Sequence, residues 1–134
     1  MLESRQSRQF QRCSRYGDYV SQDANCLFCR IVTGDIPADI VARTQTVLAF
    51  NDIDPQAPTH VLLVPIRHCA NAAELAAQSP EVLAELFSVA SDIAASRGIT
   101  GYRTVFNTGA EAGQSVFHVH LHLIGGRSLA WPPG

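Results

Sequence analysis

Three histidines alternate with apolar residues in the segment 117–124 (FHVHLHLI). Successive side chains of a β-strand point to opposite faces, so a strand here would hold the imidazoles of His118, His120 and His122 together, facing outward. The apolar residues of the segment would then face the core: Phe117, Val119, Leu121 and Leu123. Neutral imidazole can act as a nucleophile or as a metal ligand near pH 7. The alternation therefore predicts a catalytic site that handles a phosphate, or a metal site.

A glycine-containing loop precedes these histidines directly, at 109–115 (GAEAGQS). Its glycines permit positive φ and close approach of the backbone, so its N–H groups could bind an anion. The hydroxyl of Ser115 lies where it could meet a leaving group. Taken alone, such a loop is also typical of an ordinary connection between strands. Beside three histidines, it predicts the rim of a phosphate site.

Two cysteines, Cys26 and Cys29, have the C-x-x-C spacing of zinc ligands, and two histidines could complete a tetrahedral site. The same spacing also occurs in redox pairs and in buried thiols that bind no metal. Cys13 and Cys69 have no evident partners in the sequence, and we interpret them as incidental. The motif by itself leaves these three alternatives open.

Five extended segments and three helices would position these residues. The predicted strands are 40–43, 47–51, 60–65, 102–107 and 117–124, and the predicted helices are 26–33, about 71–77, and 80–97. The longest helix has Ser79 as its expected N-cap, Pro80 at its first position and Gly98 as its stop. Its apolar stripe predicts a side packed on the core: Val82, Leu86, Val89, Ala90 and Ile93. Short turns between strands and one long helix predict an α+β fold on an antiparallel sheet.

The chain has 134 residues, of which 46% are hydrophobic and 16% charged, as expected for one globular domain. Its net charge of −2 argues against a general nucleic-acid binder, since such proteins carry a basic excess, and favours a small-molecule ligand. The sequence has no apolar run of the ~18–20 residues needed to span a membrane, and its start does not resemble a signal peptide. We expect a cytoplasmic protein with reduced cysteines and no membrane partner.

Residues 1–24 are rich in Arg, Gln and Ser and lack apolar periodicity. Because such a segment cannot bury much apolar surface, we expect a disordered N-terminal extension. The extension is either without a specific role or a basic arm that contacts an acidic partner. The folded domain is expected to span residues 25–134.

The segment 113–127 (GQSVFHVHLHLIGGR) resembles the signature of the histidine triad (HIT) family, in which three histidines alternate with apolar residues. The resemblance is to its HINT branch, the histidine triad nucleotide-binding proteins. The segments 48–60 (LAFNDIDPQAPTH) and 131–134 (WPPG) are also similar to that branch. Coverage runs from about Cys26 to the last residue.

The resemblance implies a HIT-like fold and an activity, the hydrolysis of purine nucleoside 5'-phosphoramidates. His120 would attack the α-phosphorus to form a covalent nucleotidyl-histidine intermediate, which water then resolves. His122 would hydrogen-bond a phosphate oxygen, while Ser115 and His118 would face the leaving amine and supply its proton. His60 would orient the nucleophile. The chemistry implied requires no cofactor.

The same resemblance implies the nucleotide contacts. Asp52 would bind the ribose hydroxyls, Phe50 and Ile53 would wall the base, and Asn107 would contact the phosphate or the ribose. Without the resemblance, Phe50 and Ile53 could equally be core and Asp52 a turn cap. The full expected nucleotide site is Phe50, Asp52, Ile53, Asn107, Gly113, Gln114, Ser115, His120, His122 and Trp131.

Some family members bind zinc through residues that match Cys26, Cys29, His68 and His118, and all four are present here. Four protein ligands leave no open position for water, so such a zinc would be structural. His118 could not then deliver a proton, and Ser115 would take the leaving-group role. The role of His118 therefore has two alternatives.

Proteins of this branch are two-fold dimers with a joined sheet, and we expect a homodimer whose tail, with Trp131, reaches the partner. An aromatic residue and two prolines at an exposed end also favour packing against another surface. The expected ligand is a purine nucleotide. The alternative function is a nucleotide-binding or zinc-binding regulatory or scaffold protein with vestigial hydrolysis.

Overall fold

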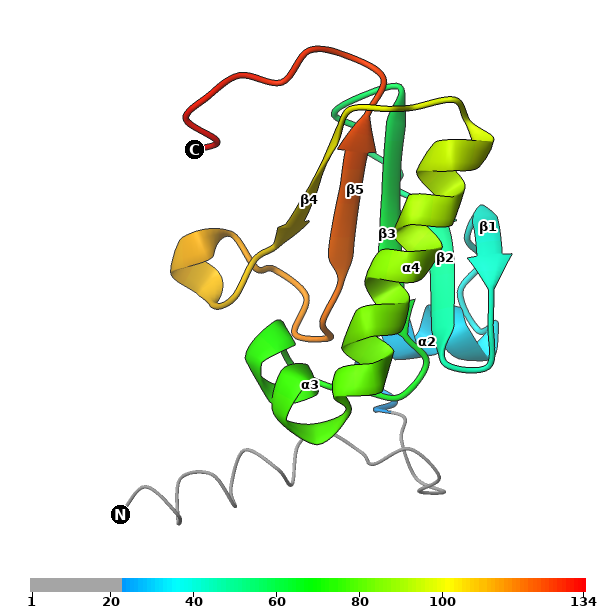
Figure 1. Cartoon of the computed structure of the whole chain (residues 1–134). Coiled ribbons are helices and arrows are strands. Elements are labelled where there is room, and N and C mark those ends of the chain that lie inside the picture. Colours follow the sequence, from blue (N-terminus) through cyan, green and yellow to red (C-terminus); the bar gives the residue numbers. More distant parts are fainter. Residues whose placement is uncertain (1–22) are drawn as a thin grey trace.

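A five-stranded antiparallel sheet forms the centre of the protein in the computed structural model, which describes residues 23–134 (Figure 1). The strands are β1 Ile40–Arg43, β2 Val47–Asn51, β3 Thr59–Pro65, β4 Tyr102–Phe106 and β5 Leu121–Gly125, in the order β1-β2-β3-β5-β4. The helices are α2 Leu27–Thr33, α3 Ala72–Gln78 and α4 Pro80–Ser96, with a 3₁₀ turn at Ala110–Ala112. The predicted α+β architecture is confirmed. The predicted N-terminal extension lies almost wholly in residues 1–22, outside the described residues.

The long helix α4 packs across one face of the sheet (Figure 1). The predicted apolar stripe is confirmed, since Val82, Leu86, Ala90 and Ile93 are buried against β2, β3 and β5. Ser79 is the N-cap residue and Pro80 the first residue of the helix, as predicted, but the Ser79 hydroxyl makes no capping hydrogen bond. Cys69, interpreted as incidental, is fully buried in this same core. Cys13 lies outside the described residues.

The short helix α2 packs on the opposite face of the sheet and covers part of it. Cys26, Phe28, Cys29 and Val32 form a second apolar cluster with β2 and β3 side chains. The sheet members of that cluster are Leu48, Phe50, Leu62 and Val64. Among residues 23–134 the cluster uses no β4 or β5 side chain, so in the part of the chain that the structure describes this face remains open beyond β3.

The last strand is shorter than the sequence predicted. Strand β5 begins at Leu121, and Phe117, predicted to face the core, is 54% exposed. The antiparallel ladder between β3 and β5 stops because Pro65, the last residue of β3, has no N–H to donate. The Pro65 carbonyl accepts instead from His118 Nε2, at 2.8 Å. The backbone N–H of Val119 donates instead to the Cys69 carbonyl, at 2.7 Å.

The prediction that the three imidazoles face outward was also wrong. His118 is fully buried and His120 is 8% exposed, since Phe28 of α2 packs edge-on against both rings. His122 is half-buried and lies beside Leu62 on the open face. Among residues 23–134, no helix combines the length and the apolar character that crossing a membrane requires.

Candidate active site and metal centre

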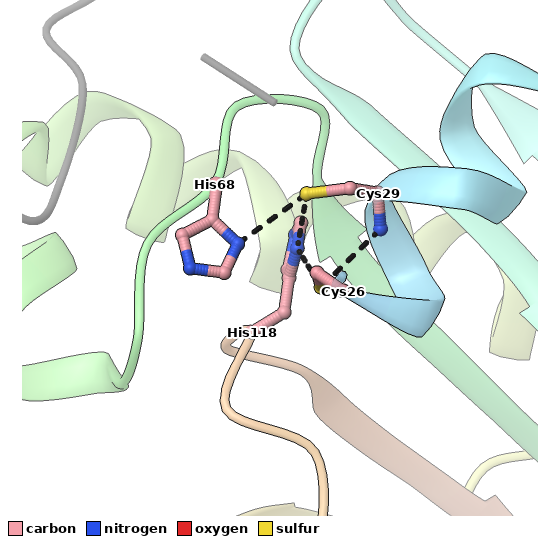
Figure 2. A group of neighbouring side chains, drawn as sticks. All are labelled: Cys26, Cys29, His68 and His118. Carbon is pink, nitrogen blue, oxygen red and sulfur yellow. Dashed lines mark hydrogen bonds between the residues drawn. The ribbon is translucent and has the colours of Figure 1, made fainter. Parts of the chain in front are cut away.

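The three histidines of the alternating segment divide between two side-chain clusters. The ring of His118 faces two cysteines and His68 (Figure 2). The rings of His120 and His122 have centroids 5.0 Å apart and lie with His60, whose ring centroid is 5.2 Å from that of His122. The irregular backbone before β5 separates His118 from the other two. One cluster has the donors of a metal centre and the other those of an active site.

A chain of hydrogen bonds sets the tautomer of His122. The backbone N–H of Gln56 donates to His60 Nδ1 at 3.0 Å, so a neutral His60 carries its proton on Nε2. That Nε2 is 2.9 Å from His122 Nδ1 and 3.4 Å from Asp52 Oδ2. Donation from His60 leaves His122 with its own proton on Nε2. His122 Nε2–H is thus a donor for an anionic substrate.

His120 has the complementary tautomer. Its Nδ1–H donates to the backbone carbonyl of His118 at 2.8 Å, which leaves an unprotonated lone pair on Nε2. This is the orientation that a nucleophilic imidazole requires. Neighbouring rings therefore offer a lone pair from His120 and an N–H donor from His122.

The surroundings keep both rings neutral at pH 7. Burial lowers the pKa of His120 below the usual value for histidine. The pKa of His122 falls to about 4, chiefly through burial and then through repulsion by the positive forms of His120 and His60. A neutral His120 can attack without first losing a proton.

Four zinc-type donors converge at the other cluster. His118 Nδ1 is 3.4 Å from Cys26 Sγ and 3.5 Å from Cys29 Sγ, and His68 Nδ1 is 3.3 Å from Cys29 Sγ (Figure 2). All four donor atoms lie within 4.8 Å of one another. Tetrahedral zinc, with bonds of ~2.3 Å to sulfur and ~2.0 Å to nitrogen, places sulfur and nitrogen ligands roughly 3.5 Å apart.

The protonation of His118 agrees with a ligand role. Its Nε2–H donates to the Pro65 carbonyl, so its lone pair is on Nδ1 and points toward the two sulfurs. Burial also lowers the pKa of His118 to about 4. Both ring nitrogens are thus engaged away from the open face. This geometry favours the metal alternative for His118 over the leaving-group alternative.

The local fold brings these donors together from three parts of the chain. Cys26 is the N-cap of α2 and its Sγ accepts from the Cys29 backbone N–H, so one helical turn holds the cysteine pair. His68 follows β3 and His118 precedes β5, and these two strands are hydrogen-bonded neighbours. The residues fit a zinc ion.

The loop before the histidines has a structural glutamine. Gln114 is buried, its side-chain oxygen accepts from the Gly109 N–H, and its amide donates to the carbonyls of Ala70 and Val116. Its backbone N–H also donates to the Gly109 carbonyl, at 3.1 Å, so Gln114 anchors the loop through both its side chain and its backbone. Gly113 has φ +93°, which strongly favours glycine there.

The predicted nucleotide contacts lie in different environments. Phe50 is 4% exposed and packs against Phe28, with ring centroids 5.5 Å apart, whereas Ile53 is fully exposed. Asp52 begins the loop after β2 and its Oδ1 accepts from the Asp54 N–H. Trp131 is 82% exposed. Within the described residues, Asp52 thus lies beside His60. Phe50 and Ile53 do not come together to form a wall that could bind a base.

Two cavities flank the clusters. One, of about 620 Å³, is lined by Cys26, His68, Ser115 and Phe117, among others. Ser115 is thus exposed on the side of the metal centre. The second cavity, of about 350 Å³, contains His60, His122 and Asn107 in its wall. Of the predicted residues, Asn107 therefore lies in the same cavity wall as His60 and His122.

Sequence reasoning missed several residues of these clusters. Phe28 buries His120, and the Gln56 N–H sets the tautomer of His60. The segment 48–60, already noted for its resemblance, contains Gln56 and was the available signal. Burial lowers the pKa of His68, and the charges of Asp23 and then of Glu74 oppose this shift; the buried Glu74 Oε2 has no hydrogen-bond partner among the described residues. Nothing in the sequence pattern singled it out.

The antiparallel sheet, its helices and the paired histidines define an α+β protein of the HIT fold. The chain belongs to the HIT domain family, whose profile matches residues 33–129. A HIT family hydrolase from Legionella pneumophila has 47% sequence identity and a TM-score of 0.79, with 82% of this chain and 100% of that chain covered. A histidine triad protein from Clostridium difficile has 35% identity and a TM-score of 0.78, over 81% of this chain and 96% of that one.

Two relatives are similar over most of their length. An uncharacterised HIT-like protein of Synechococcus elongatus is 50% identical over 109 residues, which are 81% of this chain and 96% of that protein. A 14 kDa zinc-binding protein of Zea mays is 42% identical over 118 residues, with 84% of this chain and 90% of that protein covered. The fold is thus that of HIT family hydrolases, and one relative is named for zinc.

Proposed function

We propose that this protein hydrolyses purine nucleoside 5'-phosphoramidates through a covalent intermediate on His120. The observation that carries the proposal is the pair of opposite tautomers on adjacent rings. His120 Nε2 offers a lone pair because its Nδ1–H donates to the His118 carbonyl. His122 Nε2 offers a proton because its Nδ1 accepts from His60. A phosphoryl group between the two meets a nucleophile and a hydrogen-bond donor together.

In the proposed first step, the lone pair of His120 Nε2 forms a bond to the α-phosphorus while the bond from phosphorus to the leaving nitrogen breaks. The leaving nitrogen keeps that electron pair and takes a proton, for which Ser115 is the proposed donor. His122 Nε2–H binds a non-bridging oxygen as charge develops. In the second step, water attacks the phosphorus and its proton returns to Ser115. The bond from phosphorus to Nε2 breaks, which releases the nucleoside monophosphate and restores neutral His120.

We further propose that Cys26, Cys29, His68 and His118 hold a structural zinc ion, which cross-links α2 to the segments before α3 and β5. The donor distances and the zinc-binding maize relative support this assignment. His118 would connect the two clusters, since its ring faces the sulfurs while its carbonyl orients His120. The chemical step itself proceeds on His120 and His122.

The decisive experiment compares His120→Ala with the unaltered protein on an adenosine 5'-phosphoramidate. Removing the nucleophile should lower kcat by at least roughly 10³-fold while nucleotide binding persists. Rapid acid quenching of the unaltered protein should trap a nucleotidyl adduct that the variant does not form. Turnover by the variant at the normal rate would refute the mechanism.

A second candidate, a zinc-binding or nucleotide-binding regulatory protein with vestigial hydrolysis, is favoured by the metal cluster and by the maize relative. It requires the cysteines but not the lone pair on His120. Nucleotide or zinc binding by an unaltered protein that forms no adduct and shows no turnover would favour this candidate.

We also propose a homodimer in the cytoplasm. Strand β4 is an edge of the sheet, with its backbone available for pairing, and both Tyr102 on it and Trp131 in the tail are exposed. Sedimentation should give twice the mass of one chain. A sedimenting mass equal to that of one chain at micromolar concentration would contradict the dimer.

A further inference from the structure

A cationic cavity lies against His60 and His122 on the open face of the sheet. It has a volume of about 350 Å³, and its polar wall includes His60, His122, Asn107 and the two arginines Arg103 and Arg127. The strand register explains the position of Arg103. Val105 pairs with His122 and Arg103 with Ile124, so Arg103 is the next residue along the same face.

The two arginines are held in place but not neutralised. Arg103 Nη2 donates to the Ala130 carbonyl at 2.9 Å, and Arg127 donates from Nε to the Gln56 carbonyl at 2.8 Å and from Nη1 to the Ser128 carbonyl at 2.9 Å. These acceptors are uncharged. Within residues 23–134 neither guanidinium forms an ion pair, and no carboxylate lines the cavity. Each guanidinium has five N–H groups, so both keep donors for a further acceptor.

The acid beside the histidines is Asp52, and it lies on the other side of them from the two arginines. Asp52 follows β2, and its Oδ2 lies 3.4 Å from His60 Nε2. The sheet order places β2 and β4 on opposite sides of the β3–β5 pair, which carries His60 and His122. With a ribose at Asp52 and a phosphate at His122, the leaving nitrogen would stay beside the phosphate for protonation by Ser115. The β4 side would then be left for the substituent that this nitrogen carries.

We propose that Arg103 and Arg127 form a specificity subsite for a leaving group that carries an oxyanion, a carboxylate or a phosphate. The inference rests on the proposed phosphoramidate hydrolysis, whose substrate it makes more specific. Paired guanidinium groups suit such groups because they donate charge-assisted, often bidentate hydrogen bonds. Leu129 and Pro133 also line the cavity, so occupation by the chain's own tail is the competing outcome.

Matched probes differ only in the charge of the leaving group. One pair is the adenosine 5'-phosphoramidate of glycine and that of glycinamide; a second pair carries phosphoethanolamine and ethanolamine. We expect the unaltered protein to favour the charged member of a pair by roughly tenfold or more in kcat/KM. The pair with the larger preference identifies the oxyanion as a carboxylate or a phosphate.

Arg103→Gln should reduce the preference to roughly twofold or less. Arg103→Lys should retain part of the preference, because lysine keeps the positive charge but lacks the planar guanidinium group that donates bidentate hydrogen bonds. Arg43→Gln is the matched control, since Arg43 also donates to a carbonyl, that of Val32, but lies on β1 away from the cavity. This control should keep the full preference.

Binding to the His120→Ala protein separates failure of this inference from failure of the proposed function. The Kd values are compared for the His120→Ala protein with and without Arg103→Gln. If Arg103→Gln causes the same loss of preference in Kd, the subsite stands, even where the unaltered protein turns over neither probe. Equal Kd values for the charged and uncharged probes would overturn the subsite. A preference unchanged by Arg103→Gln would overturn the subsite as well. If deletion of residues 129–134 creates a preference that the full chain lacks, the cavity is occupied by the tail.

Discussion

At the scale of single residues, hydrogen bonds to backbone groups decide what each imidazole can do. His120, His122 and His118 are alike in the sequence, yet their rings make different hydrogen bonds. His120 donates from Nδ1, His118 donates from Nε2, and His122 accepts at Nδ1. The proposed division into nucleophile, donor and metal ligand therefore follows from which ring nitrogen remains available and whether that nitrogen carries a proton.

His60→Leu tests this tautomer chain. Without the N–H of His60, His122 can place its proton on Nδ1 and present a lone pair to the phosphate, which repels the developing charge. We expect kcat to fall by roughly 10²-fold, and ¹⁵N NMR of the ring to show the changed tautomer of His122. A variant with the same His122 tautomer and unchanged kcat would show that His60 does not orient it.

At the scale of elements, the short helix α2 connects the candidate metal centre to the candidate active site. Its first turn holds Cys26 and Cys29, and Phe28 between them packs against His120 at a ring-centroid distance of 5.0 Å. A seven-residue helix is marginal by itself, so its stability depends on these tertiary contacts. Zinc would act on catalysis through the placement of this helix.

Cys26→Ala tests that connection. We expect about one zinc per chain in the unaltered protein and loss of it in the variant, together with lower thermal stability, because a structural zinc contributes directly to folding. Cys69→Ala is the control for loss of a buried thiol outside the donor set, and it should keep the metal. Elemental analysis that finds no zinc in the carefully purified unaltered protein would exclude the site.

At the scale of the whole molecule, burial of neutral histidines makes stability depend on pH. The pKa of His122 is about 4 in the folded protein, against 6.5 for an ordinary histidine. Between these values the unfolded chain binds the proton and the folded protein does not, so the free energy of unfolding falls as pH is lowered through this window. The group's contribution is fully present above pH 6.5.

Urea unfolding at pH 7, 6 and 5 measures this dependence. The limit for one histidine is about 1.4 kcal/mol per pH unit, and half-buried His122 should contribute less than that. His122→Asn should flatten the curve between pH 6 and pH 5 under the same metal conditions. An identical slope in both proteins would mean that His122 titrates normally when folded.

Local patterns in the sequence predicted the helices and strands of this fold, except that β5 begins four residues later than the predicted segment 117–124. Extended and apolar runs between turns predicted the strands, and three- and four-residue spacing predicted the buried side of α4. The resemblance at 113–127 pointed to the family that the match over 33–129 confirms. The C-x-x-C pair was also visible, since one helical turn is a local structure.

Only the tertiary structure divided the three histidines between two clusters. Strand alternation predicts one shared face, but Pro65 has no N–H with which to extend the ladder, so β5 starts at Leu121 and His118 turns into the buried cysteine pair. The tautomers likewise depend on carbonyls and N–H groups far apart along the chain. The cavity with Arg103 and Arg127 follows from strand pairing, which sequence spacing does not contain. The sequence determined that imidazoles would be concentrated in the segment 117–124. Long-range hydrogen bonds decided which ring nitrogen of each histidine is free for chemistry.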